Sequence, residues 1–285
     1  MEVQILLCLC VLLHCQKLTS SFTGNILFST NTAIIEFDID TRNLAVLVEQ
    51  SDVVYAMDYD YKNRFIYFPR YSTHDIVRFA YPSKNRTLQT VIKSSPYYPT
   101  GIAVDPTNGH IYWTDNSGQR LSRCYLDGSN VTVLSSLSLP FVIRLDLTNR
   151  WMYIVESTIG ISRSRFDLFE KEPIVNFTLG RSVYCMDIDP EEQRLYWLNN
   201  AGEMKSSKDD GSDVSTILST NVPTDYVAIG VFGSYIYFAN SYNQLVMINK
   251  EPGSTPSVLH NHTNIINSVF VLNAVGMFQT VNDYL

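Results

Sequence analysis

Six aromatic or aliphatic residues recur at nearly constant spacing, and this repeat constrains the fold more than any other feature of the chain. The residues are Leu27, Tyr67, Tyr112, Tyr153, Tyr196 and Tyr237, separated by 40, 45, 41, 43 and 41 residues. A period of about 40–45 residues, with several short strands in each unit, is typical of a β-propeller blade. Because no blade is stable alone, the repeats predict one domain.

Each repeat follows one pattern of strands and turns. An apolar strand ending in Asp, such as residues 101–105, leads through a polar turn at 106–109 to an aromatic second strand. A third strand follows, and an Asp-Gly turn, as at 127–128 or 210–211, leads to a short fourth strand. We expect the aspartates that end the first strands to accept backbone N–H bonds in the turns. They are Asp60, Asp105, Asp146 and Asp189. The third strands are predicted around Ile76, Leu121, Ile161, Met204 and Leu245.

The number of strands predicts how the ring closes. Blades 2 to 6 are expected at about 53–92, 98–136, 141–178, 181–219 and 225–261, whereas the first repeat, at 25–48, has only three strands. Residues 266–272 can supply the missing innermost strand, which removes an open sheet edge. The sequence therefore predicts an all-β fold over 24–281: a six-bladed β-propeller of four-stranded antiparallel blades, closed by the C-terminal strand completing the N-terminal blade.

The N-terminus and the sequons predict export. Residues 5–15 are apolar apart from His14, and small polar residues follow, which is typical of a signal peptide at 1–21. A buried N-terminal strand is the alternative. Four Asn-x-Ser/Thr sequons, at Asn85, Asn130, Asn176 and Asn261, predict a secreted or extracellular glycoprotein, or an ectodomain fragment of a membrane receptor. Outside the leader, no apolar segment is long enough to insert into a membrane.

The two cysteines beyond the leader, Cys124 and Cys185, fall in different strands two blades apart. They should lie too far apart for a disulfide and act as buried, small apolar residues. The formal charge is −7, and there is no run of Lys or Arg. This argues against nucleic acid and anionic membranes as partners, and favours a basic protein ligand.

The tetrapeptide Tyr112, Trp113, Thr114 and Asp115 resembles the motif of the low-density lipoprotein receptor class B repeats, the six-bladed YWTD propellers. The segments at 194–199, 65–68, 151–154 and 235–238 are partial copies. The resemblance implies that these motif residues are structural and hold the blades together. It also implies a receptor-type module that binds a protein, with further receptor modules or a co-receptor as additional partners.

Three charged residues are expected to line the central channel. Asp58, Arg144 and Asp187 each precede a turn aspartate by two residues, so they share one face of the innermost strands. Charges in apolar strands need water or partners, and the channel provides both. Ion pairing within the channel is favoured over catalysis or ligand contact.

The candidate ligand-binding face is the one formed by the loops that join strands 2 to 3 and 4 to 1. It gathers aromatic, charged and amide side chains: Tyr71, Tyr97, Tyr98, Arg120, Phe141, Glu156, Asn199 and Tyr242. His74, Asn200 and Tyr226 fall on the same loops. Tyrosine is enriched at protein-binding hot spots, whereas amides and carboxylates orient a ligand. Asn85, Asn130 and Asn176 are expected near the turns of the opposite rim.

Two other functions remain open: a calcium-dependent propeller hydrolase of lactonase or esterase type, and a structural spacer in a larger receptor. The hydrolase needs converging acidic ligands, and Arg144 in the ring would repel a cation. The chain lacks zinc-protease, phosphate-loop and nucleophile-elbow motifs. His260 and His262 have the spacing of metal ligands, but a solvated turn is favoured. We expect no enzyme activity, cofactor or metal.

Overall fold

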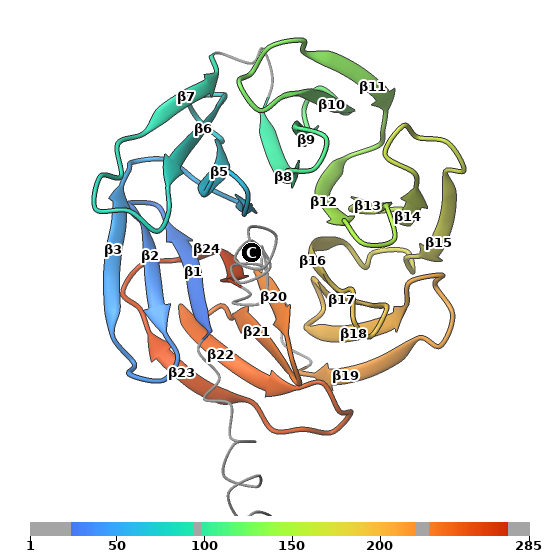
Figure 1. Cartoon of the computed structure of the whole chain (residues 1–285). Coiled ribbons are helices and arrows are strands. Elements are labelled where there is room, and N and C mark those ends of the chain that lie inside the picture. Colours follow the sequence, from blue (N-terminus) through green and yellow to red (C-terminus); the bar gives the residue numbers. More distant parts are fainter. Residues whose placement is uncertain (1–23, 94–97, 221–227, 273–285) are drawn as a thin grey trace, which may run out of the picture.

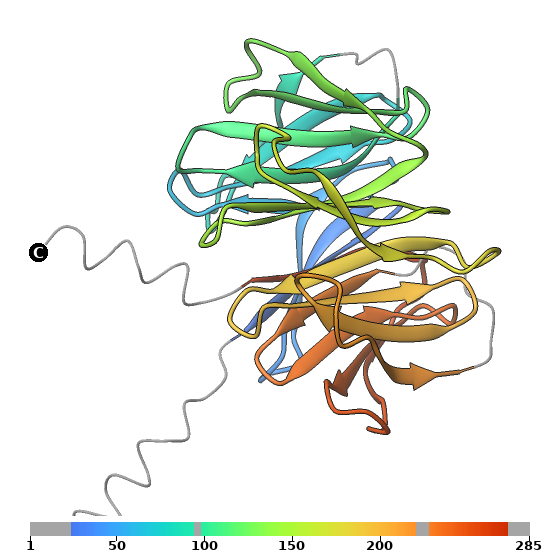
Figure 2. The ribbon, with the colours of Figure 1, turned by 90° about the vertical axis from the view of Figure 1, so that its right-hand side faces the viewer.

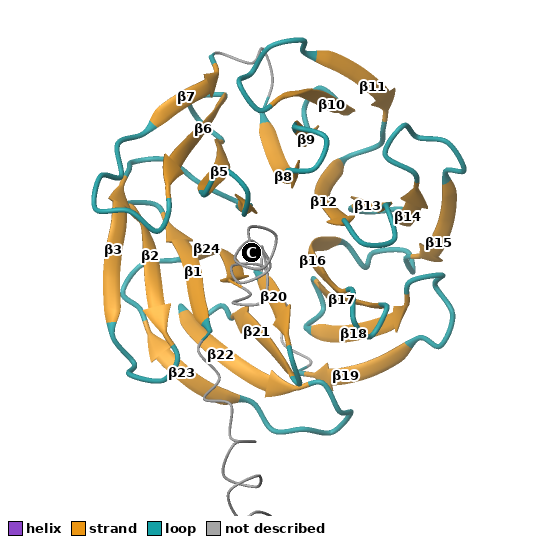
Figure 3. Ribbon diagram, viewed as in Figure 1, coloured by secondary structure: helices purple, strands orange, loops and turns teal. Residues whose placement is uncertain are grey.

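The computed structural model describes residues 24–93, 98–220 and 228–272. Six four-stranded antiparallel sheets are arranged around a central axis and form a disc, seen along the axis in Figure 1 and from the side in Figure 2. Figure 3 shows only strands and loops in these ranges. None of the described segments forms a helix long and apolar enough to cross a membrane.

Each blade is given from its innermost to its outermost strand. Blade 1 contains β24 (Ile266–Leu272), β1 (Asn25–Thr30), β2 (Ala33–Asp38) and β3 (Leu44–Glu49). Blade 2 contains β4 (Asp58–Asp60), β5 (Phe65–Arg70), β6 (Asp75–Ala80) and β7 (Gln89–Ile92). Blade 3 contains β8 (Pro99–Asp105), β9 (His110–Asp115), β10 (Arg120–Tyr125) and β11 (Thr132–Ser136).

The second half of the ring follows the same order. Blade 4 contains β12 (Pro140–Asp146), β13 (Trp151–Glu156), β14 (Gly160–Ser164) and β15 (Glu172–Asn176). Blade 5 contains β16 (Val183–Asp189), β17 (Arg194–Asn199), β18 (Glu203–Lys208) and β19 (Ser215–Ser219). Blade 6 contains β20 (Ile229–Phe232), β21 (Tyr235–Ala239), β22 (Gln244–Asn249) and β23 (Ser257–Asn261).

The two ends of the described chain meet in blade 1. Strand β24 pairs antiparallel with β1, from Asn25 opposite Leu272 to Thr30 opposite Ile266, and the two strands lie side by side in Figure 1. The all-β, six-bladed fold predicted from the repeat is therefore confirmed.

The innermost strand of blade 2 is short, because β4 begins only at Asp58, although the blade is predicted from about residue 53. The backbone before it bonds to other groups. The carbonyl of Val53 accepts the N–H of Tyr71 at 3.0 Å, and the carbonyl of Val54 accepts the Ser29 hydroxyl at 2.7 Å. This segment therefore connects blade 2 to blade 1 before it joins its own sheet.

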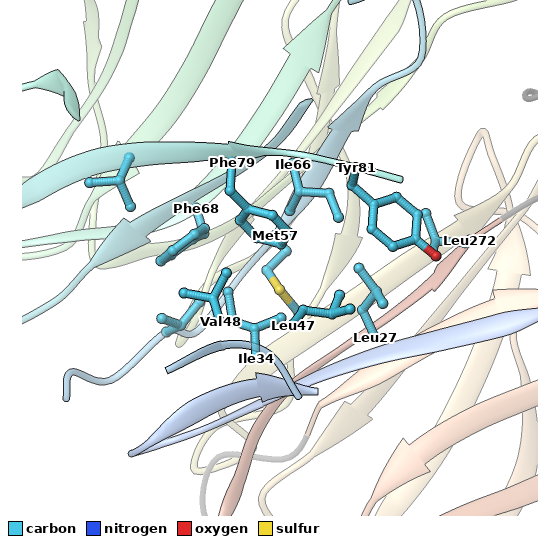
Figure 4. Packing of buried hydrophobic residues seen from close by; sticks show 12 residues of the cluster. Leu27, Ile34, Leu47, Val48, Met57, Ile66, Phe68, Phe79, Tyr81 and Leu272 are labelled. Atoms are coloured by element: carbon cyan, nitrogen blue, oxygen red, sulfur yellow. The ribbon is translucent and has the colours of Figure 1, made fainter. Parts of the chain in front are cut away.

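The core lies between neighbouring blades, and the repeated residues lie at its centre. All six, from Leu27 to Tyr237, are at most 2% exposed. Figure 4 shows the layer between blades 1 and 2, where Leu27 and Ile34 of blade 1 pack with Met57 and Phe68 of blade 2. The aromatic residues of the repeat thus supply the apolar area that makes each blade adhere to the next.

The turn aspartates behave as the sequence predicts. In blade 4, Asp146 Oδ1 accepts the N–H groups of Thr148 and Asn149, both at 2.9 Å, and Oδ2 accepts the Asn149 amide at 2.8 Å. Asp60, Asp105 and Asp189 accept the backbone N–H groups two and three residues further on in the same way. These carboxylates fix the tight turn between the first and second strands.

The tetrapeptide at 112–115 joins blade 3 to blade 4. The Thr114 hydroxyl accepts the Gly101 N–H at 2.9 Å and donates to the Phe141 carbonyl of blade 4 at 3.1 Å. Asp115 Oδ1 accepts the Gly118 N–H at 2.8 Å and thereby holds its loop. A side chain on Gly101 would lie 2.6 Å from the Phe141 carbonyl oxygen, so glycine is needed for this close approach.

Cys124 and Cys185 are buried free thiols, as predicted. Cys124 lies in β10 of blade 3 and Cys185 in β16 of blade 5. Burial raises the pKa of each thiol to about 12, so both remain protonated and behave as small apolar groups.

Candidate functional site

Antiparallel strands give the disc two different faces. We call the end that carries the connections between strands 2 and 3, and between blades, the upper face; the other end, with the remaining turns, is the lower face. The chain connectivity puts Tyr71, Tyr98, Arg120, Phe141, Glu156, Asn199 and Tyr242 at the upper end of their strands or in upper loops. Tyr97 and Tyr226 lie outside the described residues.

A continuous series of ring contacts crosses the upper face. We call it the aromatic run, and its members in order are Tyr184, Phe141, Tyr55, Tyr71, Tyr98 and His74. The successive centroid distances are 5.2, 5.3, 5.4, 4.8 and 4.2 Å. Edge-to-face and tilted contacts at such distances are favourable for aromatic rings. The run therefore forms one connected aromatic surface.

The run bridges blades that are not neighbours in the ring. Tyr55 precedes the innermost strand of blade 2 and Phe141 lies in that of blade 4, with blade 3 between them. Their rings nevertheless meet at 5.3 Å. These rings therefore come together over the mouth of the central channel.

β-bulges direct two of these rings. In blade 4, Pro140 pairs with Glu156 and Val142 with Val155, which leaves Phe141 as the extra residue. In blade 5, Val183 pairs with Asn199 and Cys185 with Leu198, which leaves Tyr184 at the equivalent position. A bulge inserts one residue and turns its side chain away from the regular alternation.

A cavity of about 20 Å³ lies beneath the rings, and Tyr55, Phe141, Tyr184, Arg144 and Asn267 are among the residues that line it. This volume suffices for about one water molecule. Three members of the aromatic run therefore border one small hollow.

The charged residues of the inner strands form short bonds between blades. Arg144 Nε lies 2.9 Å from Asp187 Oδ1, joining blades 4 and 5. Asp187 Oδ2 accepts the Val231 N–H of blade 6 at 2.8 Å, and Asp58 Oδ2 accepts the Val104 N–H of blade 3 at 2.7 Å. Each carboxylate therefore bonds to the innermost strand of the following blade.

Desolvation has the largest effect on the pKa values of Asp58 and Asp187. Burial raises the pKa of Asp58 to about 6, although the Val104 and Tyr59 N–H groups and Arg144 oppose the shift. Burial also raises the pKa of Asp187, against the opposing effect of Arg144. A buried carboxylate keeps its proton to higher pH because low-dielectric surroundings disfavour the charge.

Three predicted site residues have local partners outside the aromatic run. Arg120 pairs with Asp115 at 3.6 Å. Glu156 accepts the Ser138 N–H at 2.7 Å and lies 3.6 Å from Lys171. Asn199 accepts the Ala201 and Glu203 N–H groups and donates to Glu203 at 2.7 Å. These contacts hold the loops that surround the run.

Tyr242 lies away from the run and is 73% exposed. It borders a hollow of about 220 Å³ between blades 5 and 6, whose walls include Leu198, Leu218 and Phe238. A second hollow of about 430 Å³ lies between blades 4 and 5 and is lined by Asn176, Trp197 and Lys205, among others. The upper face therefore carries hollows between blades as well as the central rings.

Sequence reasoning missed Tyr55 and Tyr184 as members of the upper surface. A signal was present, because Tyr55, Phe141 and Tyr184 each lie three residues before Asp58, Arg144 and Asp187, respectively. An aromatic residue three positions before the charged residue of an innermost strand thus marks this part of the upper face.

All four sequon asparagines are exposed. Asn85 follows β6 and Asn130 follows β10, so both lie at the lower face, as expected. The expectation for Asn176 is wrong: it is the last residue of β15, an outermost strand, and so lies at the upper end. Asn261 ends β23 at the same end. The turn predicted for His260 is also wrong, because His260 lies within β23.

No protein-family model matches the chain. The vitellogenin receptor of Solenopsis invicta is 25% identical over 214 residues, which cover 71% of this chain and 12% of that receptor. Protein cueball of Drosophila yakuba is 24% identical over 204 residues, which cover 66% of this chain and 32% of that protein. The chain thus spans at most about a third of the length of either relative.

A chain in the crystal structure of a nidogen/laminin complex has the same fold. It superimposes with a TM-score of 0.77 at 16% identity, over 88% of this chain and 99% of that chain. The predicted resemblance to propellers of the low-density lipoprotein receptor type is confirmed.

Proposed function

We propose that this chain, a six-bladed propeller resembling the class B repeats of the low-density lipoprotein receptor family, is an extracellular module that binds a protein through its upper face. One observation carries the proposal: the aromatic run forms a continuous surface over the channel mouth. Preformed aromatic anchors contribute much of the affinity at protein interfaces, because they cover large areas at little entropic cost.

The run has the gradient of burial that a binding site needs. Phe141, at the channel mouth, is 6% exposed, whereas Tyr98, near the outer end, is 37% exposed. Edge contacts join Phe141 to Tyr55 and Tyr55 to Tyr71, and a tilted contact joins Tyr71 to the exposed ring of Tyr98. A partner would therefore bury a rigid surface and lose little side-chain entropy on binding.

The relatives support a protein as the ligand. One of them is a receptor named for vitellogenin, and the structure with the same fold comes from a complex of nidogen with laminin. Because the chain spans only part of these relatives, the identity of their ligands is not transferred to it. The proposal is confined to a protein ligand, for which the charge of −7 favours a basic surface.

An extracellular location agrees with the exposure of all four sequon asparagines. The signal peptide predicted for residues 1–21 would direct the chain there, and it lies outside the described residues.

The two alternatives fit the described residues less well. In the hydrolase hypothesis, Asp58 and Asp187 bind calcium, but Asp187 is paired with Arg144 at 2.9 Å. A guanidinium in this position opposes a divalent cation. The spacer hypothesis predicts a uniformly polar face, whereas Tyr98 and Tyr242 project into solvent.

The proposal is tested with an array of purified extracellular ectodomains, probed with the wild-type chain and three variants. Tyr71→Ala interrupts the aromatic run, and Tyr98→Ala shortens it. Tyr125→Ala is the matched control, because Tyr125 is 45% exposed at the lower end of β10. We expect the first two variants to weaken binding at least tenfold, which corresponds to about 1.4 kcal/mol, and the control to leave it unchanged.

A glycan gives a second test of the same face. Tyr71→Asn completes a sequon with Ser72 and Thr73, so that a chain secreted from eukaryotic cells carries a glycan on the run. Thr132→Ala removes the natural lower-face sequon at Asn130. We expect the first change to abolish binding and the second to preserve it. Equal binding by all variants would contradict the proposed face.

A further inference from the structure

His260 and His262 lie on the outer part of blade 6, apart from the aromatic run. His260 lies in β23 and His262 directly follows its last residue, and the two rings converge. Nε2 of His260 lies 3.4 Å from Nδ1 of His262, and the ring centroids are 5.6 Å apart. The end of this strand thus brings two imidazoles into one small volume.

The spacing of these nitrogens matches that of two ligands on one metal ion. Zinc is held by imidazole nitrogens at about 2.0–2.1 Å in tetrahedral geometry, which places two ligand nitrogens about 3.3–3.4 Å apart. The terminal torsion of a histidine side chain is soft, so a modest ring rotation turns both lone pairs toward a common point. We infer that His260 and His262 form a two-histidine site for a borderline-soft divalent cation such as Zn²⁺, Ni²⁺ or Cu²⁺.

Blade 1 holds the two rings in this arrangement. The buried ring of Phe28 lies 5.4 Å from His262, edge-on, and 6.3 Å from His260. The buried ring of Phe37 lies 6.1 Å from His260. These rings form a wall on one side of the pair at the contact between blades 6 and 1. In the unfolded chain the same histidines lose this support, so the folded protein should bind metal more tightly.

The other side of the pair is accessible to a solvated ion. His262 lines a hollow of about 410 Å³, together with Glu49, Thr32, Thr263 and Asn264. Within the described residues no third His, Cys, Asp or Glu joins the pair closely enough to complete a metal site. Water therefore supplies the remaining ligands, and the site is open.

The bordering charges have opposite signs: Glu49 lines the hollow, and Arg42 donates to the Leu259 carbonyl at 3.3 Å. The site is therefore defined by the geometry of the two rings and not by an excess of positive or negative charge around them.

The site differs in kind from the calcium site of the hydrolase hypothesis. Imidazole suits Zn²⁺, Ni²⁺ and Cu²⁺, with affinity rising from Ni²⁺ to Cu²⁺, whereas Ca²⁺ and Mg²⁺ prefer oxygen. We expect the chain to bind one equivalent of Zn²⁺, Ni²⁺ or Cu²⁺ per molecule, with Cu²⁺ bound most tightly. No binding of Ca²⁺ or Mg²⁺ is expected at this pair.

The test is a calorimetric titration of the chain, purified with a tag that contains no histidine, with ZnCl₂, NiCl₂, CuCl₂ and CaCl₂. The variants are His260→Gln and His262→Gln, and the control is His110→Gln, because His110 stacks on Tyr125 in blade 3. We expect each of the two site variants to weaken Zn²⁺ binding at least tenfold and the control to retain it. Circular dichroism of the metal-free variants checks that they fold.

Two further readouts separate this site from nonspecific binding. Nitrogen hyperfine splitting in the electron paramagnetic resonance spectrum of the Cu²⁺-loaded chain should indicate two imidazoles, and only one in either variant. Zn²⁺ should raise the midpoint of thermal unfolding of the wild type, because a ligand that binds the folded state stabilises that state. It should not do so for a variant that carries both His260→Gln and His262→Gln. Absence of Zn²⁺ binding, or equal binding by wild type and both variants, would overturn the inference.

Discussion

Asp58 shows how a single residue of an innermost strand couples stability to pH. Its carboxylate accepts the Val104 N–H from the next blade, yet burial raises its pKa to about 6. An unfolded aspartate titrates near pH 3.9. The folded state therefore binds the proton more tightly, and this residue favours folding below about pH 4 and loses that contribution as the pH rises through 6.

The first prediction concerns Asp58→Asn, which keeps an oxygen acceptor for the Val104 N–H and removes the titrating proton. The stability of the variant relative to wild type should rise by up to about 3 kcal/mol between pH 4 and pH 7. Urea unfolding followed by circular dichroism at several pH values measures this difference. A difference that does not change with pH would show that Asp58 has an ordinary pKa in the folded protein.

The second prediction concerns the Thr114 hydroxyl, which joins blades 3 and 4 through Gly101 and Phe141. Thr114→Val keeps the shape and leaves the buried Gly101 N–H without this acceptor, which should cost about 1–3 kcal/mol of unfolding free energy. Thr90→Val on the exposed strand β7 is the matched control and should change stability by less than about 0.5 kcal/mol. Equal effects of the two substitutions in urea titrations would argue against an interblade role for Thr114.

At the scale of the element, the Asp-Gly turns do more than reverse the chain. Gly128 has φ +85°, and a Cβ added to it would lie 2.0 Å from the Val91 carbonyl oxygen in the outermost strand of blade 2. Gly211 has φ +83°, and a Cβ added to it would lie 2.0 Å from the Ile174 carbonyl oxygen of blade 4. The glycine therefore permits both the left-handed backbone and contact with the preceding blade.

Gly253 allows these two requirements to be separated, and this is the third prediction. Gly253 has φ +82°, and an added Cβ would meet nothing within 4 Å. Gly253→Ala should cost about 1–2 kcal/mol for the left-handed backbone alone. Gly128→Ala should cost about 1–3 kcal/mol more, because the methyl group also displaces blade 2. Equal losses in denaturant unfolding would mean that the contact with blade 2 contributes nothing.

At the scale of the whole molecule, ring closure depends on β24. This strand buries Ile266, Val269 and Leu272, and it pairs with β1 at the other end of the described chain. The fourth prediction is that a chain ending at Asn264 loses its cooperative thermal transition and aggregates, because β1 is left with an open edge. A chain ending at Leu272 is the control and should keep the transition. Size-exclusion chromatography and circular dichroism distinguish the outcomes, and a cooperative monomer without β24 would contradict the prediction.

The repeat predicted the ring because the strands and turns of each blade follow patterns that extend over only a few residues of the sequence. The alternation of strands, the turn aspartates and the Asp-Gly turns all act over a few residues, and the structure bears them out. The position of Asn176 was wrong because the predicted blade limits did not specify where β15 ends. A shift of a few residues moves a side chain from one face of the disc to the other.

The six blades, their closure and the free thiols were predictable from the repeat, because they depend on a period and on pairings within each sheet. Which side chains meet depends instead on how the blades pack. Tyr55 reaches Phe141 because ring closure brings blades 2 and 4 together over the channel, and a bulge turns Phe141 there. His260 and His262 converge against Phe28 of blade 1. Such contacts join residues far apart in the chain, so their geometry is set by how the blades pack and not by any local pattern.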